Sequence, residues 1–344
     1  MPEKDIYIII LSAGKGTRMG SRDENYSKVA FPILGKPLVN YVLDASKCMN
    51  AKETYVVVGF GGEGTAKCVG DEAKIVWQNE VLGTGHAVMQ VSEYLKDKDG
   101  DVMILCGDTP LLTAETLQKI YKKHIKNEDK LTICSTVLSN PAGYGRVIRE
   151  DKSYRVLEVR PYAEINEEEA EIREINSGIY VVDNKLLQEY LPKLSRENKK
   201  DEYYLSDIVK IFQKDGHAVD TFVLEDAADI YNINDRVQLA FAAKTIKKRV
   251  NHELMLSGVS IEDPDATYIS PDAKIGKDTV ILPNTTIIGK CEIGEGNWIG
   301  PNVTLVRVNM GDNNRVHYST LTDVEIGDNQ IVGPFESHRN EKIC

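Results

Sequence analysis

A six-residue repeat near the carboxyl end is the feature that most restricts how this chain can fold. Aliphatic residues recur at every sixth position at Ile269, Ile275, Ile281, Ile287, Ile293, Ile299 and Leu305. This period is typical of a parallel β-helix, in which each repeat supplies one short strand and a turn, and the aliphatic side chains stack inside the coils. The spacing slips at Met310 and resumes at Val316. Beyond Val332 we expect a polar tail that contains His338.

Before about residue 140, short β-rich runs alternate with helical patterns. The runs predict strands over residues 6–11, 54–58, 74–77, 102–106 and 131–137, and the patterns between them predict helices over 37–48, 85–96 and 113–126. This alternation favours a mostly parallel, doubly wound α/β sheet with helices on both faces. Because ligands of such sheets bind at the carboxyl ends of the strands, the residues that follow the strands are the candidates for chemistry.

After about residue 140 the predicted elements become shorter. Strands are expected over 144–149, 154–159 and 177–182, followed by helices over 202–214 and 235–256. We therefore expect three parts, an α/β domain over residues 1–233, a linking helix over 234–260 and the β-helix over 261–344.

Composition excludes several classes of function. The chain has 42 basic and 53 acidic residues, a net charge of -11, which disfavours a nucleic-acid partner. Its longest apolar run, residues 6–11, is far shorter than the ~18 residues that cross a bilayer, and no signal peptide precedes it. We therefore expect a cytoplasmic protein without a membrane partner. The 6 cysteines show neither disulfide nor metal spacing and are expected to be reduced.

One short segment reverses the acidic balance. Its basic residues are Lys15, Arg18, Arg22, Lys28 and Lys36, with only two acidic residues between them. This local excess is either chance variation of the surface or the landing site of a small anion.

The first predicted strand runs directly into a loop of small and basic residues, Leu11-Ser12-Ala13-Gly14-Lys15-Gly16-Thr17-Arg18. Small residues let backbone amides approach a ligand closely, and such amides beside Lys and Arg suit a polyphosphate. A dinucleotide fingerprint would need glycine where Met19 stands, and the GKS or GKT of a Walker loop is absent. The loop therefore predicts a phosphate-binding turn of another kind, with Arg18 and Lys28 available to the phosphates.

Further motifs follow this loop. They are Lys28, Gly35-Lys36-Pro37, Leu82-Gly83-Thr84-Gly85-His86, Gly107-Asp108, Gly143-Tyr144-Gly145-Arg146, Glu174-Ile175-Asn176-Ser177-Gly178, Glu202-Tyr203-Tyr204 and Asn234. In this order they resemble the uridylyltransferase domain of the bifunctional N-acetylglucosamine-1-phosphate uridylyltransferase and glucosamine-1-phosphate acetyltransferase family. The repeat resembles the start of that family's β-helix. The resemblance implies a Rossmann-like nucleotidyltransferase domain followed by a short left-handed parallel β-helix.

The resemblance also implies the reaction and the residues that serve it. The reaction is Mg²⁺-dependent uridylyl transfer from UTP to N-acetylglucosamine-1-phosphate, which gives the cell-wall precursor UDP-N-acetylglucosamine. The nucleotide would be held by Leu11, Ser12, Ala13 and Gly14, with Arg18 and Lys28 as the catalytic residues on its phosphates and Gln78, Gly83 and Thr84 at the uracil. The sugar would lie against Gly107, Gly145, Glu158 and Asn176. Asp108 and Asn234 would hold Mg²⁺.

Several of these residues have a structural alternative. Asp108 could cap a turn, Asn234 could cap the following helix, and Gln78 could be a solvent-facing strand end. A sugar phosphate with a second pKa of about 6 is mostly dianionic at pH 7 and needs no general base. The chemistry then depends on positioning and cations rather than on proton transfer. His86 is accordingly expected to be a hydrogen-bonded loop residue.

Three departures from the family pattern leave alternatives open. The loop before Lys28 is longer than usual, and the segment around Glu158 lacks the family's lysine, which leaves the choice of sugar in doubt. The chain ends at Cys344, before the coils that carry the acetyl-CoA site, so acetyltransferase activity is expected to be absent. The alternatives are another sugar-1-phosphate, an inactive nucleotide-sugar-binding regulatory subunit, or an acyltransferase. The flat faces of the β-helix predict a homotrimer.

Overall fold

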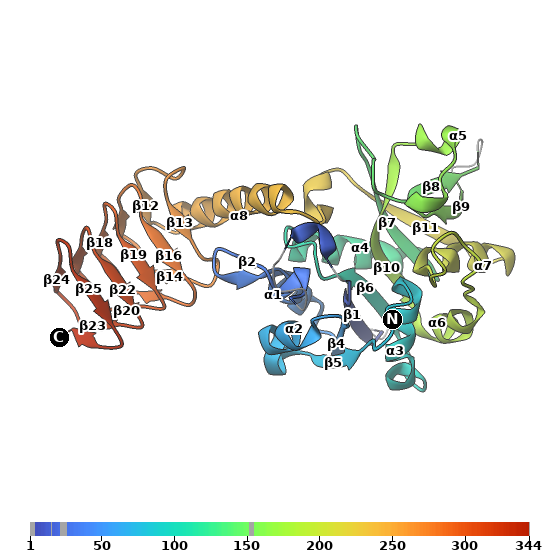
Figure 1. Ribbon diagram of the computed structural model, residues 1–344, viewed down its shortest axis with the longest axis horizontal. Coiled ribbons are helices and arrows are strands. Elements are labelled where there is room, and N and C mark those ends of the chain that lie inside the picture. The colour runs from blue at the N-terminus through green and yellow to red at the C-terminus, as the bar shows by residue number, and fades with distance from the viewer. Residues whose placement is uncertain (1–3, 15, 21–25, 151–154, 344) are drawn as a thin grey trace. The chain divides into compact units, whose positions relative to one another are not determined.

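The computed structural model describes residues 4–14, 16–20, 26–150 and 155–343. It divides into two compact units, shown in Figure 1. The first comprises Met1–Phe31 and Leu38–Asp235, and the second comprises Pro32–Pro37 and Arg236–Cys344. Among the described residues, no helix combines the length and the apolar character that a membrane span requires.

A nine-stranded sheet forms the centre of the first unit, in the order β11-β7-β10-β6-β1-β4-β5, with β8 paired to β10 and β9 to β8. The strands are β1 (Ile6–Ser12), β4 (Glu53–Val58), β5 (Lys74–Trp77), β6 (Asp101–Cys106), β7 (Leu131–Val137), β8 (Arg146–Arg149), β9 (Val156–Arg160), β10 (Glu174–Asp183) and β11 (Val219–Leu224). Strand β1 is parallel to β4 and β6, and β4 is parallel to β5. Strand β10 runs antiparallel to both β6 and β7. The predicted α/β class is confirmed, and the sheet is mixed around β10.

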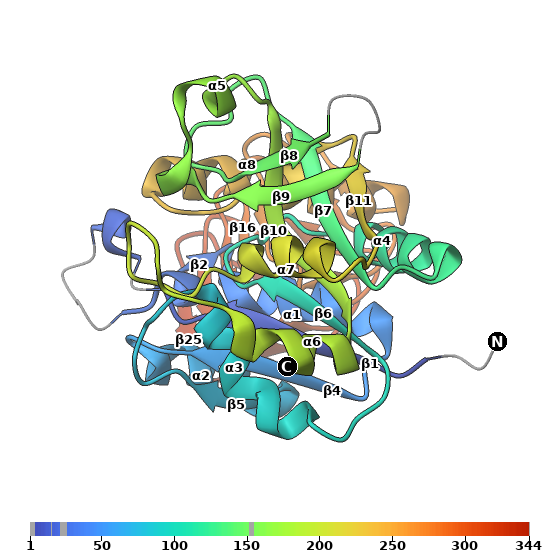
Figure 2. The ribbon, with the colours of Figure 1, turned by 90° about the vertical axis from the view of Figure 1, so that its right-hand side faces the viewer.

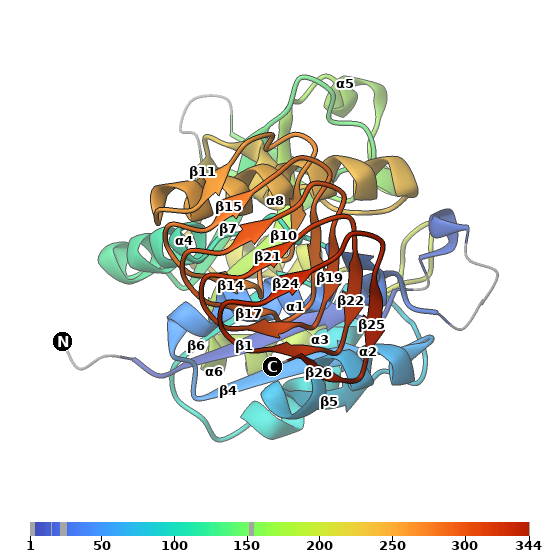
Figure 3. The ribbon, with the colours of Figure 1, turned by 90° about the vertical axis from the view of Figure 1, so that its left-hand side faces the viewer.

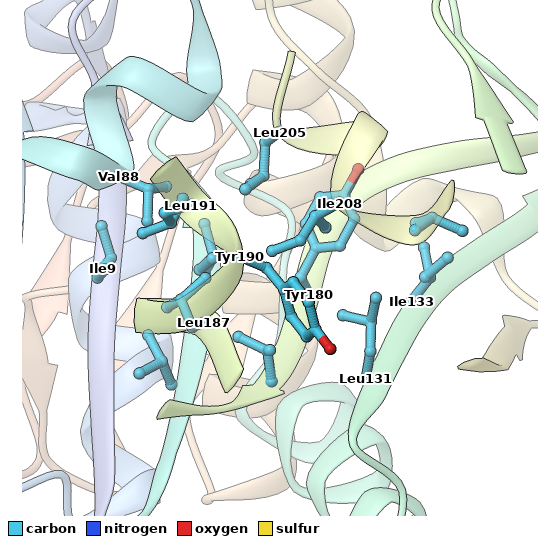
Figure 4. Close-up of a cluster of buried hydrophobic side chains, with 14 of the residues drawn as sticks. Ile9, Val88, Leu131, Ile133, Tyr180, Leu187, Tyr190, Leu191, Leu205 and Ile208 are labelled. Atoms are coloured by element: carbon cyan, nitrogen blue, oxygen red, sulfur yellow. The ribbon is translucent and has the colours of Figure 1, made fainter. Parts of the chain in front are cut away.

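Helices cover both faces of this sheet. They are α1 (Leu38–Ser46), α2 (Gly62–Val69), α3 (Thr84–Leu95), α4 (Ala114–Asn127), α6 (Asn184–Tyr190) and α7 (Ile208–Lys214). The short helix α5 (Glu167–Ala170) lies between β9 and β10 and buries no residue. In β1, Ile8 and Ile10 pack toward α1, α2 and α4, whereas Tyr7 and Ile9 pack toward α3, α6 and α7. Figure 2 views the face that carries α6 and α7, and Figure 4 shows Ile9 within its buried cluster. The side chains on both faces of the sheet are apolar, since helices shield both faces from water.

The sequence predicted several elements almost to the residue and others only in part. The strands over 74–77 and 131–137 match β5 and β7, and the helix over 113–126 matches α4 within one residue. The helix expected over 202–214 is instead a 3₁₀ turn, η7 (Leu205–Asp207), followed by α7. Helix α2 was missed because its glycines give it a low helix propensity. Residue 154, where one strand was expected to begin, lies outside the described residues.

The second unit contains the long helix α8 (Arg236–Leu256), a small hairpin and a β-helix. The hairpin consists of β2 (Pro32–Ile33) and β3 (Lys36–Pro37). The three parallel sheets of the β-helix each have five strands. The first holds β12 (Ser260–Ile261), β15 (Val280–Ile281), β18 (Trp298–Ile299), β21 (Arg315–Val316) and β24 (Ile331–Val332). The second holds β13 (Tyr268–Ile269), β16 (Thr286–Ile288), β19 (Thr304–Val306), β22 (Thr320–Thr322) and β25 (Ser337–Arg339). The third holds β14 (Lys274–Ile275), β17 (Glu292–Ile293), β20 (Asn309–Met310), β23 (Glu325–Ile326) and β26 (Lys342–Ile343).

The interior of the β-helix is built from the repeated aliphatic residues. Ile269, Ile287, Leu305 and Leu321 are in register on successive rungs and are each 0% exposed. Figure 3 shows the stacked rungs nearly along their axis. The hexapeptide prediction is therefore confirmed, and the coils form the left-handed parallel β-helix that the resemblance implies.

The prediction that a polar tail follows Val332 was wrong. Strand β25 continues the second sheet, and His338 is in register with Leu321. The hexapeptide pattern does not reveal this rung because a histidine stands where an aliphatic residue is expected. Both ring nitrogens of His338 face carboxylates, those of Glu336 and Glu341.

The stacked interior makes a testable prediction. Leu305→Ala removes buried methyl groups between Ile287 and Leu321, which we expect to destabilise the second unit by about 2–5 kcal/mol. Urea unfolding in a Trp77→Phe background measures this, because the remaining tryptophan, Trp298, belongs to the second unit. The control Thr304→Ala, on the outward side of the same strand, should change stability by less than about 0.5 kcal/mol. Equal effects of the two substitutions would contradict the stacking account.

Candidate active site

A cleft of about 290 Å³ opens at the carboxyl edge of the sheet in the first unit. It is lined by Leu11, Ser12, Ala13, Gly14, Lys28, Val29, Gln78, Val81, Gly83, Thr84, Ala87, Cys106, Asp108, Glu202 and Asn232. An adjoining hollow of about 860 Å³ shares Gly14, Gln78 and Glu202 with it and adds Phe60 and Trp77. Strands β1, β4, β5 and β6 are connected by parallel pairs, so their carboxyl ends meet at this edge. The site therefore lies where the doubly wound fold predicts a ligand.

The centre of the cleft is a charged cluster around Lys28. The Lys28 Nζ lies 2.5 Å from Asp108 Oδ2 and 2.9 Å from Asn234 Oδ1. The side chains of Lys28 and Asp108 are only 13% and 15% exposed, so their charges interact through a poorly solvated space. Three distant segments of the chain thus converge on one ammonium group.

The segment before α8 is held directly onto Asp108. The backbone N–H of Ile233 donates to the carbonyl of Asp108 at 2.9 Å, and Asn232 Nδ2 donates to Asp108 Oδ1 at 2.9 Å. Sequence reasoning missed Asn232. The available signal was its spacing of two from Asn234, because alternate residues of an extended segment face the same side.

Close backbone packing shapes the floor of the cleft. Gly107 lies against Ser12, and a Cβ at Gly107 would collide with the Ser12 hydroxyl. Gly16 has a φ of +60°, and a Cβ there would collide with the side chain of Lys28. Among the described residues, the buried Ser12 Oγ has no hydrogen-bond partner, although Ser12 lines the cleft. A buried hydroxyl without a partner is costly, so it marks a position where a ligand atom would bind.

Gln78 is held in one orientation at the edge of the cleft. Its Nε2 donates to the carbonyl of Gly83 at 3.1 Å and lies 3.0 Å from His86 Nδ1. These contacts fix the amide nitrogen and leave Oε1 as the group that can accept a hydrogen bond from a ligand. His86 also contacts Gln90 through its other ring nitrogen, at 3.1 Å. This pairing on both sides fits the expectation of a hydrogen-bonded histidine, here within α3.

The Glu202-Tyr203-Tyr204 motif fixes the turn at the start of α3. Gly85 N donates to the carbonyl of Tyr203 at 2.8 Å, and Leu205 N donates to Thr84 Oγ1 at 3.0 Å. Gly83 has a φ of +104°, and a Cβ there would lie 2.6 Å from the Tyr203 carbonyl oxygen. Position 83 therefore requires glycine, because the Tyr203 carbonyl leaves no room for a side chain there.

Of the residues expected at the sugar, Gly107 lies on the floor of the cleft, whereas Gly145, Glu158 and Asn176 do not line it. The backbone N–H of Asn176 donates to the Gly145 carbonyl at 3.0 Å, and Asn176 Nδ2 donates to the Tyr180 hydroxyl at 2.6 Å. Glu158 Oε1 lies 2.5 Å from Arg160 Nη2, and its other oxygen lies 3.5 Å from Lys210 Nζ. The absence of the family's lysine therefore does not leave Glu158 without a cation, because Arg160 supplies one.

The described basic residues of the amino-terminal segment have different surroundings. Arg18 is exposed and lines neither the cleft nor the adjoining hollow. Lys36 belongs to the second unit, where its Nζ pairs with Asp272 at 2.6 Å. Lys15 and Arg22 lie outside the described residues. Of this segment, Lys28 is the cation that the structure places in the cleft.

The cleft also contains a thiol that sequence reasoning did not assign to it. Cys106 ends β6 next to Gly107 and lines the cleft. Burial raises the pKa of the Cys106 thiol to about 12, and the charge of Asp108 adds to this effect. The group is therefore neutral at physiological pH and is not a nucleophile.

The donor atoms around Lys28 also fit a small, hard cation. A carboxylate oxygen of Asp108 and the amide oxygen of Asn234 both contact the same ammonium group, so they converge on one positive charge. Mg²⁺ prefers such oxygen donors and is commonly bound by few protein groups together with substrate phosphates. Among the described residues, no group of three or more His, Cys, Asp or Glu side chains could hold a metal. A metal here would thus share its coordination with the substrate.

Comparison with known families gives the class of the protein. Residues 7–244 match the nucleotidyl transferase family, and residues 272–307 match the bacterial transferase hexapeptide (six repeats) family. The chain is therefore a nucleotidyltransferase with hexapeptide coils. The bifunctional protein GlmU of Geobacillus sp. (strain WCH70) is 42% identical over 329 residues, 96% of this chain and 71% of the relative. The bifunctional protein GlmU of Clostridioides difficile (strain 630) is 40% identical over 327 residues, 95% of this chain and 70% of the relative. The chain belongs to the GlmU family.

A half-buried carboxylate beside Glu158 makes a prediction about stability. Burial raises the pKa of Asp207 to about 6, Lys210 and Arg160 oppose the rise, and Glu158 and Glu164 add to it. An aspartate in the unfolded chain titrates near pH 4, so between about pH 4 and 6 the folded chain binds the extra proton. The contribution of Asp207 to stability therefore falls as the pH rises through this range.

Asp207→Asn removes this titration. We expect its Tm relative to that of the unsubstituted chain to increase as the pH is raised from 5 to 7, measured by thermal unfolding at each pH. The control Asp201→Asn, at a side chain 72% exposed, should give a difference that does not change with pH. A constant Tm difference for Asp207→Asn would show that the buried carboxylate does not titrate in this range.

Proposed function

We propose that this chain transfers the uridylyl group of UTP to N-acetylglucosamine-1-phosphate, forming UDP-N-acetylglucosamine and pyrophosphate. The observation that carries the proposal is the Lys28 ammonium held between Asp108 and Asn234 in the cleft. The family supports the same reaction class, because two GlmU relatives are each 42% identical over nearly the whole chain. The assignment of the base and the sugar rests on the resemblance and on the residues around the cleft.

The reaction needs charge and position rather than a general base. A phosphate oxygen of the dianionic sugar phosphate attacks the α-phosphorus of UTP. A new phosphorus–oxygen bond forms, and the bond to the bridging oxygen of pyrophosphate breaks, so pyrophosphate leaves with the electron pair. Because both reactants are anions, their approach requires cations and hydrogen-bond donors placed in advance. Lys28 is the charged donor in this role, with Arg18 as a second cation from the exposed turn, and Ser12 Oγ is a neutral donor on the cleft floor.

Asp108 and Asn234 would hold Mg²⁺. When bound, the ion neutralises phosphate charge and helps to orient the triphosphate. Asn232 holds the Asp108 carboxylate through its Nδ2 donor, so that the second carboxylate oxygen stays directed at Lys28. These contacts position the carboxylate before the substrates bind.

The nucleotide base would bind at Gln78. Its free Oε1 can accept a hydrogen bond from the imide N–H of uracil, a donor that distinguishes uracil from cytosine. The backbone of residues 11–14 and the turn at Gly83 and Thr84 complete that side of the cleft. On the sugar side, Gly107, Gly145, Asn176 and the Glu158–Arg160 pair would contact the sugar phosphate. Because the residues around Glu158 differ from the family pattern, glucose-1-phosphate stays the alternative acceptor.

The test is pyrophosphate release over a panel of nucleoside triphosphates and sugar-1-phosphates, with and without Mg²⁺. We expect release with UTP and N-acetylglucosamine-1-phosphate, and none after chelation of the metal. If glucose-1-phosphate were the only sugar phosphate that supported release, it would replace N-acetylglucosamine-1-phosphate as the proposed acceptor. No release with any pair would favour a nucleotide-sugar-binding regulatory subunit.

The lack of acetyltransferase activity stays a prediction. It is tested by measuring coenzyme A release from acetyl-CoA in the presence of glucosamine-1-phosphate, and we expect none.

Asp108→Ala tests the cluster itself. We expect turnover to fall at least about 100-fold, since metal stabilisation of transferred phosphoryl charge is worth several kcal/mol. The variant should remain folded but unfold at a lower temperature, because Lys28 loses its carboxylate partner in a poorly solvated cleft. The matched control is Asp99→Ala, at a side chain 79% exposed, which should leave turnover unchanged. Normal turnover in Asp108→Ala would remove Asp108 from the mechanism.

We further propose that the β-helix assembles into a homotrimer. Its first sheet places Val280, Trp298, Arg315 and Ile331 at one position on successive rungs, with Trp298 47% and Ile331 72% exposed. A flat face that exposes large apolar side chains is suited to association. Light scattering should give about 115 kDa, three times the 38.4 kDa chain, and a smaller mass for Trp298→Glu. A 38.4 kDa species at micromolar concentration would contradict the trimer.

A further inference from the structure

Arg146 is a buried cation that no carboxylate neutralises. It begins strand β8 directly after Gly145 and is only 3% exposed. Burial lowers the pKa of its guanidinium, and the group that opposes this shift is Tyr162 rather than a carboxylate. Among the described residues, its buried Nε has no hydrogen-bond partner. Burying a charge without a counter-ion costs free energy, so the position of Arg146 points to a role beyond packing.

The guanidinium donates to the turn that precedes it. Arg146 Nη1 donates to the Pro141 carbonyl at 2.8 Å and to the Tyr144 carbonyl at 2.5 Å. The Tyr144 N–H donates to the same Pro141 carbonyl at 3.3 Å, and Gly143 has a φ of +86°, which suits the third position of a type II turn. Hydrogen bonds from a charged donor are stronger than those from a neutral one, so Arg146 fixes the shape of this turn.

The turn touches the cleft through the side chain of Tyr144. Burial raises the pKa of the Tyr144 hydroxyl, a hydrogen bond with the backbone of Asn232 opposes the rise, and the charge of Asp108 adds to it. Asn232 lines the cleft and donates to Asp108 Oδ1 at 2.9 Å. The turn fixed by Arg146 therefore lies beside the segment that holds Asp108, and all of these residues belong to the first unit.

The residue that follows the turn, Gly145, is held on its carbonyl side. The Asn176 N–H donates to the Gly145 carbonyl at 3.0 Å. A Cβ at Gly145 would lie 2.9 Å from the carbonyl oxygen of Arg160. Gly145 is therefore fixed against strands β9 and β10, and its N–H belongs to the peptide unit that it shares with Tyr144.

The hold on the Tyr144 carbonyl sets the direction of that N–H. A trans peptide unit is planar, so the Tyr144 carbonyl and the Gly145 N–H point in opposite directions. Within the described part of the chain, no group accepts a hydrogen bond from the Gly145 N–H. Because Arg146 holds the carbonyl, it also orients this N–H, which stays available to a ligand.

We propose that Arg146 orients the Gly145 N–H to donate a hydrogen bond to an oxygen atom of the sugar. The inference rests on the proposed function, since it requires a sugar phosphate at Gly145. Arg146 is a positioning residue, because it lines neither the cleft nor the adjoining hollow and acts through the turn. Without its hold, the peptide unit can rotate and the donor to the sugar is lost, whereas the nucleotide contacts are unchanged.

Steady-state kinetics of Arg146→Met test this. We expect the KM for N-acetylglucosamine-1-phosphate to rise about 10-fold, the loss of roughly one hydrogen bond, while the KM for UTP stays within about twofold. Arg146→Lys keeps a charged donor without the planar fork, so its KM for the sugar phosphate should rise only about threefold. Arg173→Met is the matched control at an exposed arginine and should change neither KM. Equal changes in both KM values for Arg146→Met would overturn the proposal.

Hydrogen exchange gives a readout that does not depend on activity. In Arg146→Met the Tyr144 amide, which closes the turn, should exchange faster, and the Asn176 amide should exchange at its normal rate. An unchanged Tyr144 rate would overturn the proposal, as would an unchanged KM for the sugar phosphate in Arg146→Lys if Arg146→Met does not fold. If the unsubstituted chain transfers no nucleotide while Tyr144 exchanges faster in the variant, the proposed function fails and the hold of Arg146 on the turn stands.

Discussion

The contact between the Lys28 ammonium and the oxygens of Asp108 and Asn234 is the interaction on which the site depends. It joins a 3₁₀ turn after the first loop, the second residue after β6 and the segment before α8. Charges brought together in a poorly solvated cleft are costly unless they pair. The same contact holds an ammonium group beside two oxygen atoms that suit a metal ion, so that cations can be placed before two anionic substrates meet.

The strands that position the contact between Lys28, Asp108 and Asn234 are held in place by their own apolar packing, which does not require that contact. The apolar strands β1 and β6 are covered on both faces, so their carboxyl ends hold the loop at Ser12 and the residues Gly107 and Asp108 at fixed positions. Small residues then allow backbone to approach backbone where a larger residue would collide, as at Gly83 and Gly107. The residues proposed to contact the substrates lie on loops, and the sheet below these loops holds them in position.

Regular patterns made much of this predictable from the sequence. The aliphatic period revealed the β-helix, and the apolar runs revealed the strands that end at the cleft. What the sequence did not reveal depends on contacts between distant segments. The spacing of Asn232 from Asn234 was a signal in the sequence, but the contact of Asn232 with Asp108 joins segments 124 residues apart. Lys36 looked like part of a phosphate patch, yet its ion pair is with Asp272, more than 200 residues away.

In the proposed reaction the sugar phosphate itself attacks the α-phosphorus of UTP in the cleft around Lys28. The most direct measurement uses N-acetylglucosamine-1-phosphate with ¹⁸O in its three non-bridging phosphate oxygens, followed by ³¹P NMR of the products. Direct attack predicts that UDP-N-acetylglucosamine keeps all of the label, including the oxygen between its two phosphorus atoms, and that pyrophosphate contains none. Label in pyrophosphate, or formation of UMP without a nucleotide sugar, would contradict it.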